Sequence, residues 1–150
     1  MKKIKENATS KKDFNRIILA VDGSDGSKRA VKKALHLAKK TGVDVTAIHV
    51  MEPYLPLSDL NYSYPDILEI TKKFGKDILD KVKKQGSEHG VNVKTKLVEG
   101  IPDDQIIKEA KKDDLIIMGC KGRTALSRIL VGSVCEKVLH HSKSPVMMIR

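Results

Sequence analysis

The sequence predicts an α/β fold with a five-stranded parallel open sheet and helices on both faces. Short apolar runs alternate with longer segments whose apolar residues recur every three or four positions. Such alternation is typical of βαβ units, which join parallel strands through right-handed crossovers. At 150 residues the chain suits one domain. We expect residues 1–13, with five lysines and two acidic residues, to be a flexible basic leader before a domain of residues 14–150.

Each element has its own signal. Strands are expected at 16–21, 43–51, 91–98, 115–118 and 145–149. The first is an uninterrupted apolar run, as in strands covered on both faces, whereas 91–98 alternates. Turn and cap residues at 22–27 precede a helix that Gly42 closes. Further helices are expected from 67 to about 90, from 102 to 111 and from 129 to 139.

Composition excludes several classes of protein. No apolar run approaches the roughly 18 residues that a membrane span needs, and the basic start lacks the apolar stretch of a secretory signal. We therefore expect a cytoplasmic protein. Two cysteines without CxxC or HxxxH spacing predict neither a disulfide framework nor a metal site. The net charge of +10 favours anionic partners, but nucleic-acid binding usually needs a recognition module or stacking aromatics, and neither is evident.

A glycine-rich segment stands out after the fourth strand. It reads Gly119-Cys-Lys-Gly122, then nine residues, then Gly132-Ser133 before an amphipathic stretch. Glycine lets the backbone approach a ligand closely, and a helix start presents unpaired N–H groups. Together they predict an anion cradle at the carboxyl edge of the sheet, and a bound nucleotide is the leading hypothesis. Neither GxxxxGKS/T nor a GxGxxG after the first strand is present, which argues against a P-loop or an ordinary dinucleotide site.

The segment 118–134 resembles the universal stress protein family, and in particular its ATP-binding branch with the hallmark G-x2-G-x9-G-S/T. The similarity extends to Val21-Asp-Gly-Ser24, His49-Val50 and Asp114-Leu-Ile-Ile-Met-Gly119, and covers roughly residues 14–150. Two positions depart from the family pattern: Cys120 stands where Ser or Thr is usual, and Lys121 where His is frequent. The resemblance implies a Rossmann-like fold similar to the adenine nucleotide alpha hydrolases.

The resemblance also implies a set of nucleotide-binding residues. Gly119 and Gly122 would wrap the ribose and phosphates, and Gly132 and Ser133 would offer donors to the β- and γ-phosphates. Asp22 would face the adenosine, although it could instead cap the following helix. The implied set is Ala20, Asp22, Val50, Met118, Gly119, Cys120, Lys121, Gly122, Arg123, Gly132, Ser133 and Val134.

Three functions remain open. The first is an ATP-binding regulatory or stress-response protein with slow or no hydrolysis, because the glycine loop lacks a carboxylate or Gln to orient water. The alternative is an ATPase or other nucleotide-processing enzyme, and a lesser one is a basic nucleic-acid-binding protein. Mg²⁺ or Mn²⁺ would be carried on the phosphates, and no catalytic residue is assigned. The resemblance implies a homodimer through the apolar strand 145–150; a protein partner is not identified.

Overall fold

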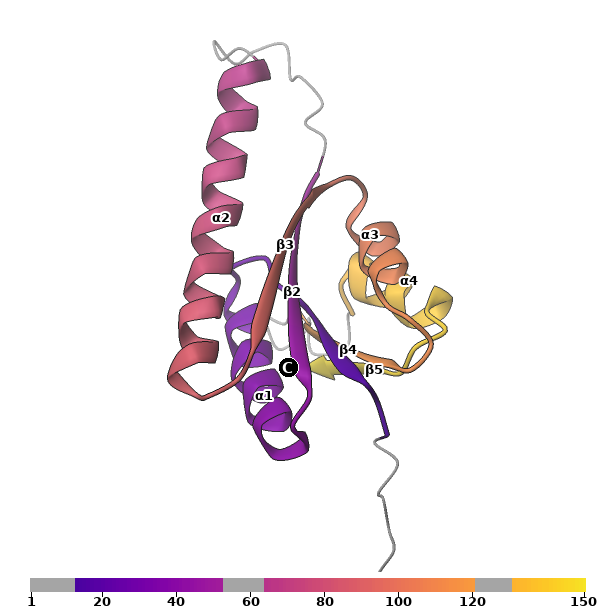
Figure 1. The fold of residues 1–150 in the computed structure, drawn as a ribbon. Helices are drawn as coiled ribbons and strands as arrows, with labels where there is room; N and C mark the ends of the chain where they lie inside the picture. The colour runs from indigo at the N-terminus through magenta and orange to yellow at the C-terminus, as the bar shows by residue number, and fades with distance from the viewer. Residues whose placement is uncertain (1–12, 53–63, 121–130) are drawn as a thin grey trace, which may run out of the picture.

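The computed structural model describes residues 13–52, 64–120 and 131–150, which form the predicted α/β fold (Figure 1). Strands and helices alternate strictly along the chain. They are β1 (Arg16–Ala20), α1 (Asp25–Thr41), β2 (Asp44–Met51), α2 (Tyr64–Glu88), β3 (Val93–Glu99), α3 (Pro102–Glu109), β4 (Asp114–Gly119), α4 (Ser133–His141) and β5 (Val146–Ile149).

All five strands are parallel, in the order β3-β2-β1-β4-β5. β1 lies in the centre, and its last residue, Ala20, is in register with Ile48 of β2 and Met118 of β4. The chain moves outward from β1 to β3 and then returns to add β4 on the other side of β1. This reversal opens a crevice beyond the carboxyl ends of the central strands, where ligands bind in open α/β sheets.

Helices cover both faces of the sheet, with α1 and α2 on one side and α3 and α4 on the other (Figure 1). Successive strand residues point to opposite faces. In β1, Ile17 and Leu19 therefore pack in the core under α1 and α2, while Ile18 packs under α3 and α4. Both cores are almost wholly aliphatic, and burial of these side chains is the main force that holds the layers together.

The start of the last helix differs from the prediction. Residues 129–130 lie outside the described part of the chain, but Val131 and Gly132 are not helical and α4 begins only at Ser133. Gly132 has extended torsion angles, φ −60° and ψ 150°, and is the N-cap. Glycine is a poor residue for a helix interior, which favours this later start. The helix terminus consequently lies at Gly132–Ser133. Gly42, by contrast, ends α1 as predicted, with φ 65°.

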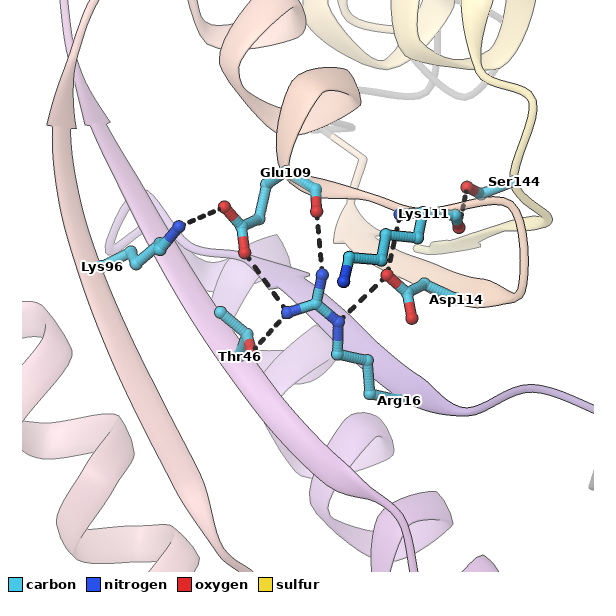
Figure 2. Close-up of polar contacts among 7 residues, drawn as sticks. All are labelled: Arg16, Thr46, Lys96, Glu109, Lys111, Asp114 and Ser144. Carbon is cyan, nitrogen blue, oxygen red and sulfur yellow. Dashed lines mark hydrogen bonds and ion pairs between the residues drawn. The ribbon is translucent and has the colours of Figure 1, made fainter.

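A polar network joins the amino ends of the central strands to α3 (Figure 2). The Arg16 guanidinium donates to Asp114 at 3.0 Å, to the Glu109 carboxylate at 3.3 Å and to the Glu109 carbonyl at 2.9 Å. Asp114 also accepts from the Lys111 N–H at 2.8 Å. One side chain thus ties β1, β4 and α3 together at the edge opposite the crevice, leaving the carboxyl edge free for a site.

The predicted basic leader lies outside the described residues, apart from residue 13. Among the helices that the structure describes, none is long and apolar enough to cross a membrane.

Candidate functional site at the carboxyl edge of the sheet

A pocket of about 210 Å³ opens at the carboxyl ends of β1, β2 and β4. Helices α3 and α4 form its walls, and the segment that follows β1 closes one side. Its lining residues are Ala20, Val21, Asp22, Ser27, Ile48, Val50, Glu52, Pro102, Ile106, Met118, Gly119, Gly132, Ser133, Val134 and Cys135.

The floor of the pocket follows from strand alternation. Residues two apart share a face of the sheet, so Ile48, Val50 and Glu52 form one row along β2 and beyond its end. Ala20 and Asp22 form a second row from β1, and Met118 extends the floor onto β4. In both rows the side chains within the sheet are apolar, and the last side chain, at the carboxyl edge, is acidic. The floor is therefore an apolar slot with two carboxylates at its outer end.

Three polar side chains fix the turn after β1. The Ser24 N–H donates to Asp22 Oδ1 at 2.9 Å, and the Ser27 N–H donates to Ser24 Oγ at 3.2 Å. The Asp22 N–H in turn donates to Ser27 Oγ at 3.2 Å. Ser24 is thus the N-cap of α1. Capping was the alternative to ligand contact considered for Asp22, and Ser24 takes that role instead. Asp22 still lines the pocket, with one carboxylate oxygen engaged in the turn.

A buried histidine supports the same turn from the opposite face. His49 is 8% exposed, and its Nδ1 lies 2.7 Å from the Val21 carbonyl, which can only accept, so that nitrogen carries the proton. The ring also packs edge-on against Phe74 of α2, with centroids 6.1 Å apart. His49 therefore links the end of β1 to α2, directly behind the pocket wall.

The amino end of α4 faces into the pocket. Gly132, the N-cap, and the first-turn residues Ser133, Val134 and Cys135 all line it. The first N–H groups of a helix have no partner within the helix, and they carry a partial positive charge. Gly132 has no side chain to cap them. This end of the pocket is therefore suited to anionic oxygen atoms.

Two buried cysteines adjoin this wall. The Cys135 thiol donates to the Gly119 carbonyl at 3.3 Å, and burial, with Cys120 and Asp22 nearby, raises the pKa of Cys135 from 9.0 to about 12. Cys135 is therefore a neutral thiol at physiological pH and places no negative charge beside the α4 terminus. Among the described residues, no group of three His, Cys, Asp or Glu side chains could hold a metal ion.

The structure brings most of the predicted site residues together. Eight of the twelve line the pocket: Ala20, Asp22, Val50, Met118, Gly119, Gly132, Ser133 and Val134. Cys120 is buried at its edge, where its N–H donates to the Ile149 carbonyl at 2.7 Å, but it is not a lining residue. Lys121, Gly122 and Arg123 lie outside the described residues.

Several lining residues were not predicted. Alternation from Val50 would have indicated Ile48 and Glu52, since residues two apart on a strand share a face. Pro102 and Ile106 reach the pocket only because α3 packs over this end of the sheet, and no local signal indicates that contact.

Comparison with known proteins places these features in a family context. The model of the universal stress protein family matches residues 13–150. Universal stress protein MJ0531 of Methanocaldococcus jannaschii is 40% identical over an alignment of 141 residues, which covers 91% of this chain and 82% of the relative.

Solved structures share the fold. Universal stress protein UspA from Lactobacillus plantarum superposes with a TM-score of 0.78 at 27% identity, covering 91% of this chain and 98% of that one. Three more distant universal stress protein structures hold adenine nucleotides. They are a complex with cAMP (24% identity, TM-score 0.69, 92% and 98% covered), one from Archaeoglobus fulgidus with dAMP (24%, 0.61, 91% and 98%) and one from Arabidopsis thaliana with AMP (21%, 0.62, 90% and 90%).

Proposed function

This chain belongs to the universal stress protein family, and from that premise we propose that it is a regulatory protein that holds ATP in the carboxyl-edge pocket with slow or no hydrolysis. Family members with bound AMP, cAMP and dAMP support an adenine nucleotide as the ligand class. The observation that carries the proposal is the meeting, in one pocket, of an apolar slot, a carboxylate and a helix amino terminus.

Each part of the pocket suits one part of a nucleotide. The slot of Ile48, Val50 and Ile106 offers the apolar surface that a planar base needs. Asp22 stands between the slot and α4, and its second carboxylate oxygen, which has no hydrogen-bond partner among the described residues, can accept from a ribose hydroxyl. The α4 terminus at Gly132 and Ser133 offers N–H donors to the phosphates, as helix termini commonly do.

The described residues supply little for hydrolysis. Asp22 and Glu52 are the acidic side chains among the lining residues. Glu52 follows β2, and Asp22, which lies near Cys135 of α4, has one carboxylate oxygen engaged by the Ser24 N–H. Phosphoryl transfer needs an oriented water and charge stabilisation at the γ-phosphate. A divalent ion would be held through the phosphates and water, which Mg²⁺ commonly accepts. We therefore infer that ATP is retained and that turnover, if it occurs in the cell, depends on a partner that completes the site.

Small molecules released from freshly purified, denatured protein should include ATP, identified by mass spectrometry. Calorimetry should give micromolar binding that Gly132→Val abolishes, because the added side chain stands at the phosphate end. Steady phosphate release that the same substitution abolishes would instead establish an ATPase. Salt-sensitive DNA binding that persists in Gly132→Val would instead establish a nucleic-acid-binding protein.

We also propose that two copies associate through β5. This strand ends the sheet, pairs with β4 on its inner side, and exposes Met147, so its outer edge is a template for another strand. Light scattering at micromolar concentration should give the mass of a dimer, and a monomer mass would contradict the association.

The two cysteines are free and buried, as is common in the reducing cytoplasm, where we expect the protein to act.

A further inference from the structure

Two cysteine side chains lie close together beside the pocket. Cys120 directly follows β4 and is 7% exposed, and Cys135 lies in the first turn of α4 and is 5% exposed. Both belong to the core between the sheet and the helices α3 and α4, and both are free thiols. The nucleotide-binding function proposed above gives neither thiol a chemical task.

The contacts of Cys135 place its sulfur atom next to Cys120. Sγ of Cys135 lies 3.3 Å from the carbonyl oxygen of Gly119. Across a trans peptide bond that oxygen is about 2.8 Å from the Cα of the following residue, so the sulfur lies within about 6 Å of the Cys120 Cα. The Cys135 thiol also interacts directly with the Cys120 side chain. The two sulfur atoms are therefore near neighbours, as a disulfide requires.

The two thiols differ in their access to the pocket. Among the described residues, Cys135 lines the pocket and Cys120 does not. The pocket volume of about 210 Å³ is many times the space that one water molecule needs, so an oxidant as small as hydrogen peroxide can enter. Oxidation should therefore begin at Cys135, with Cys120 behind it as the second thiol.

We propose that Cys120 and Cys135 form a reversible modification site, at which a small hydroperoxide converts the two thiols into an intramolecular disulfide. The Cys135 sulfur attacks a peroxide oxygen, the O–O bond breaks, and Cys135 becomes a sulfenic acid. The peroxide takes up the thiol proton and leaves as an alcohol, or as water if it is hydrogen peroxide. The Cys120 sulfur then attacks the Cys135 sulfur and displaces a molecule of water. The thiols lose two electrons, which the peroxide gains.

The surroundings of Cys135 make the first step slow. The thiolate is the effective nucleophile. Burial, together with the neighbouring Cys120 and Asp22, raises the pKa of Cys135 to about 12, so little thiolate is present at neutral pH. Brief exposure to peroxide should leave both thiols intact, and the disulfide should accumulate only while the oxidant persists. Such transient disulfides are the kind that occurs in reducing compartments.

The disulfide would act on the wall that faces the phosphate end of the pocket. Cys120 and Cys135 flank the glycine-rich segment in the sequence, so the bond would join the two ends of that segment. It would also remove the thiol proton that the Gly119 carbonyl accepts, and it would tie the end of β4 to the first turn of α4.

Prolonged incubation of the full chain with hydrogen peroxide, followed by mass spectrometry, tests the site. The protein should lose the mass of two hydrogen atoms. Trypsin cuts after Lys121 and Arg128, which separates the two cysteines into the peptides 113–121 and 129–137. These peptides should be recovered joined, and dithiothreitol should separate them.

Two single substitutions distinguish the roles of the thiols. In Cys120→Ser the thiol that faces the pocket has no partner, so Cys135 should gain one oxygen atom and react with dimedone, which traps sulfenic acids. Cys135→Ser is the matched control, because its hydroxyl can still donate to the Gly119 carbonyl. Here Cys120, which does not line the pocket, should remain an unmodified thiol. Thermal melting should show that both variants are folded.

Four results would overturn the inference. In the unmodified protein they are persistence of both thiols under conditions that oxidise the urea-unfolded chain, oxidation of Cys135 without a bond to Cys120, and a disulfide that joins two chains instead of two residues of one chain. The fourth is rapid oxidation of Cys120 in Cys135→Ser, which would show that the pocket is not the route of the oxidant. All four concern the thiols alone, so they are independent of whether the pocket binds ATP.

Discussion

Gly26, in the first turn of α1, lies in direct backbone contact with Gly119, the last residue of β4. A Cβ built on Gly119 would overlap the Gly26 carbonyl, and one built on Gly26 would lie 2.9 Å from the Cys120 carbonyl oxygen. Real Cβ atoms do not approach backbone so closely. The start of α1 and the end of β4 can therefore meet only because both residues are glycine, and Gly119 also lines the pocket.

This contact predicts that Gly119→Ala is destabilising. The added methyl group must push α1 away from β4, and overpacking of this kind costs about 2 kcal/mol. The shift should also weaken nucleotide binding, because the pocket floor moves with it. Urea unfolding and calorimetry measure the two effects.

Gly132→Ala is the control for stability. A Cβ at Gly132 would have no neighbour within 4 Å, and its φ of −60° is open to alanine. Its unfolding free energy should match that of the unmodified protein within about 0.5 kcal/mol. Equal stability losses in the two variants would show that the contact between Gly26 and Gly119 has no special role.

The sequence predicted the fold because apolar runs and helical spacing are local signals, and the described strands and helices follow them closely. It predicted the pocket only in part. The family pattern indicates that Gly119 is glycine so that a ligand can approach closely. The structure adds a second reason, because any side chain at position 119 would overlap the backbone of Gly26. The sequence indicates Gly26 only as a turn residue. The wall at Pro102 and Ile106 depends on how α3 packs, which local sequence does not encode. Glu52 was missed because alternation was not extended beyond the end of the strand.

Replacement of Arg16 should also lower the unfolding free energy. Asp114 is buried, with its side chain 4% exposed, and replacement of Arg16 by Met would leave that carboxylate without its charged partner (Figure 2). Loss of one partner of a buried pair is strongly destabilising, and we expect Arg16→Met to lower the unfolding free energy by about 3 kcal/mol. Urea denaturation measures the change.

Arg16→Lys separates charge from geometry. Lysine keeps the positive charge beside Asp114, but its donors all lie on one nitrogen, whereas the guanidinium reaches the Glu109 carboxylate and the Glu109 carbonyl from two separate nitrogen atoms. A smaller loss of about 1 kcal/mol is expected. If the two variants are equally unstable, the hydrogen-bond geometry rather than the ion pair dominates this network.

Substitutions at Asp22 and Ser24 should have opposite effects: the first should weaken ATP binding and keep stability, and the second should lower stability and keep ATP binding. In Asp22→Asn the side-chain oxygen can still accept from the Ser24 N–H, so stability should be kept, while loss of charge at the pocket should weaken ATP binding about tenfold. In Ser24→Ala the cap of α1 is lost, which costs about 1 kcal/mol, but Ser24 does not line the pocket. Its affinity for ATP should be nearly unchanged. Parallel losses in both measurements would contradict this separation of roles.

The neutral Cys135 thiol predicts a decline of stability in alkali. Burial, together with the neighbouring Cys120 and Asp22, raises its pKa in the folded protein from 9.0 to about 12. Below about pH 8 the thiol is protonated in both folded and unfolded chains, so it contributes no pH dependence there. Between pH 9 and pH 12 the unfolded chain releases the proton and the folded chain retains it, so unfolding becomes progressively easier as the pH rises. At pH 10 the loss amounts to about 1.4 kcal/mol.

Urea unfolding at pH 8 and pH 10, under reducing conditions, measures how far the unfolding free energy declines. Other groups also titrate in this range, so the contribution of Cys135 is obtained by comparison with a variant that lacks the thiol. Cys135→Ala removes the thiol, and its stability should fall less between the two pH values than that of the unmodified protein, by about 1.4 kcal/mol. Cys120→Ala keeps the Cys135 thiol and its burial, which is the largest cause of the raised pKa, so most of the decline should persist. An identical decline in Cys135→Ala and the unmodified protein would mean that the folded state ionises this thiol as readily as the unfolded chain does, and the wall beside α4 would then carry a negative charge in alkali.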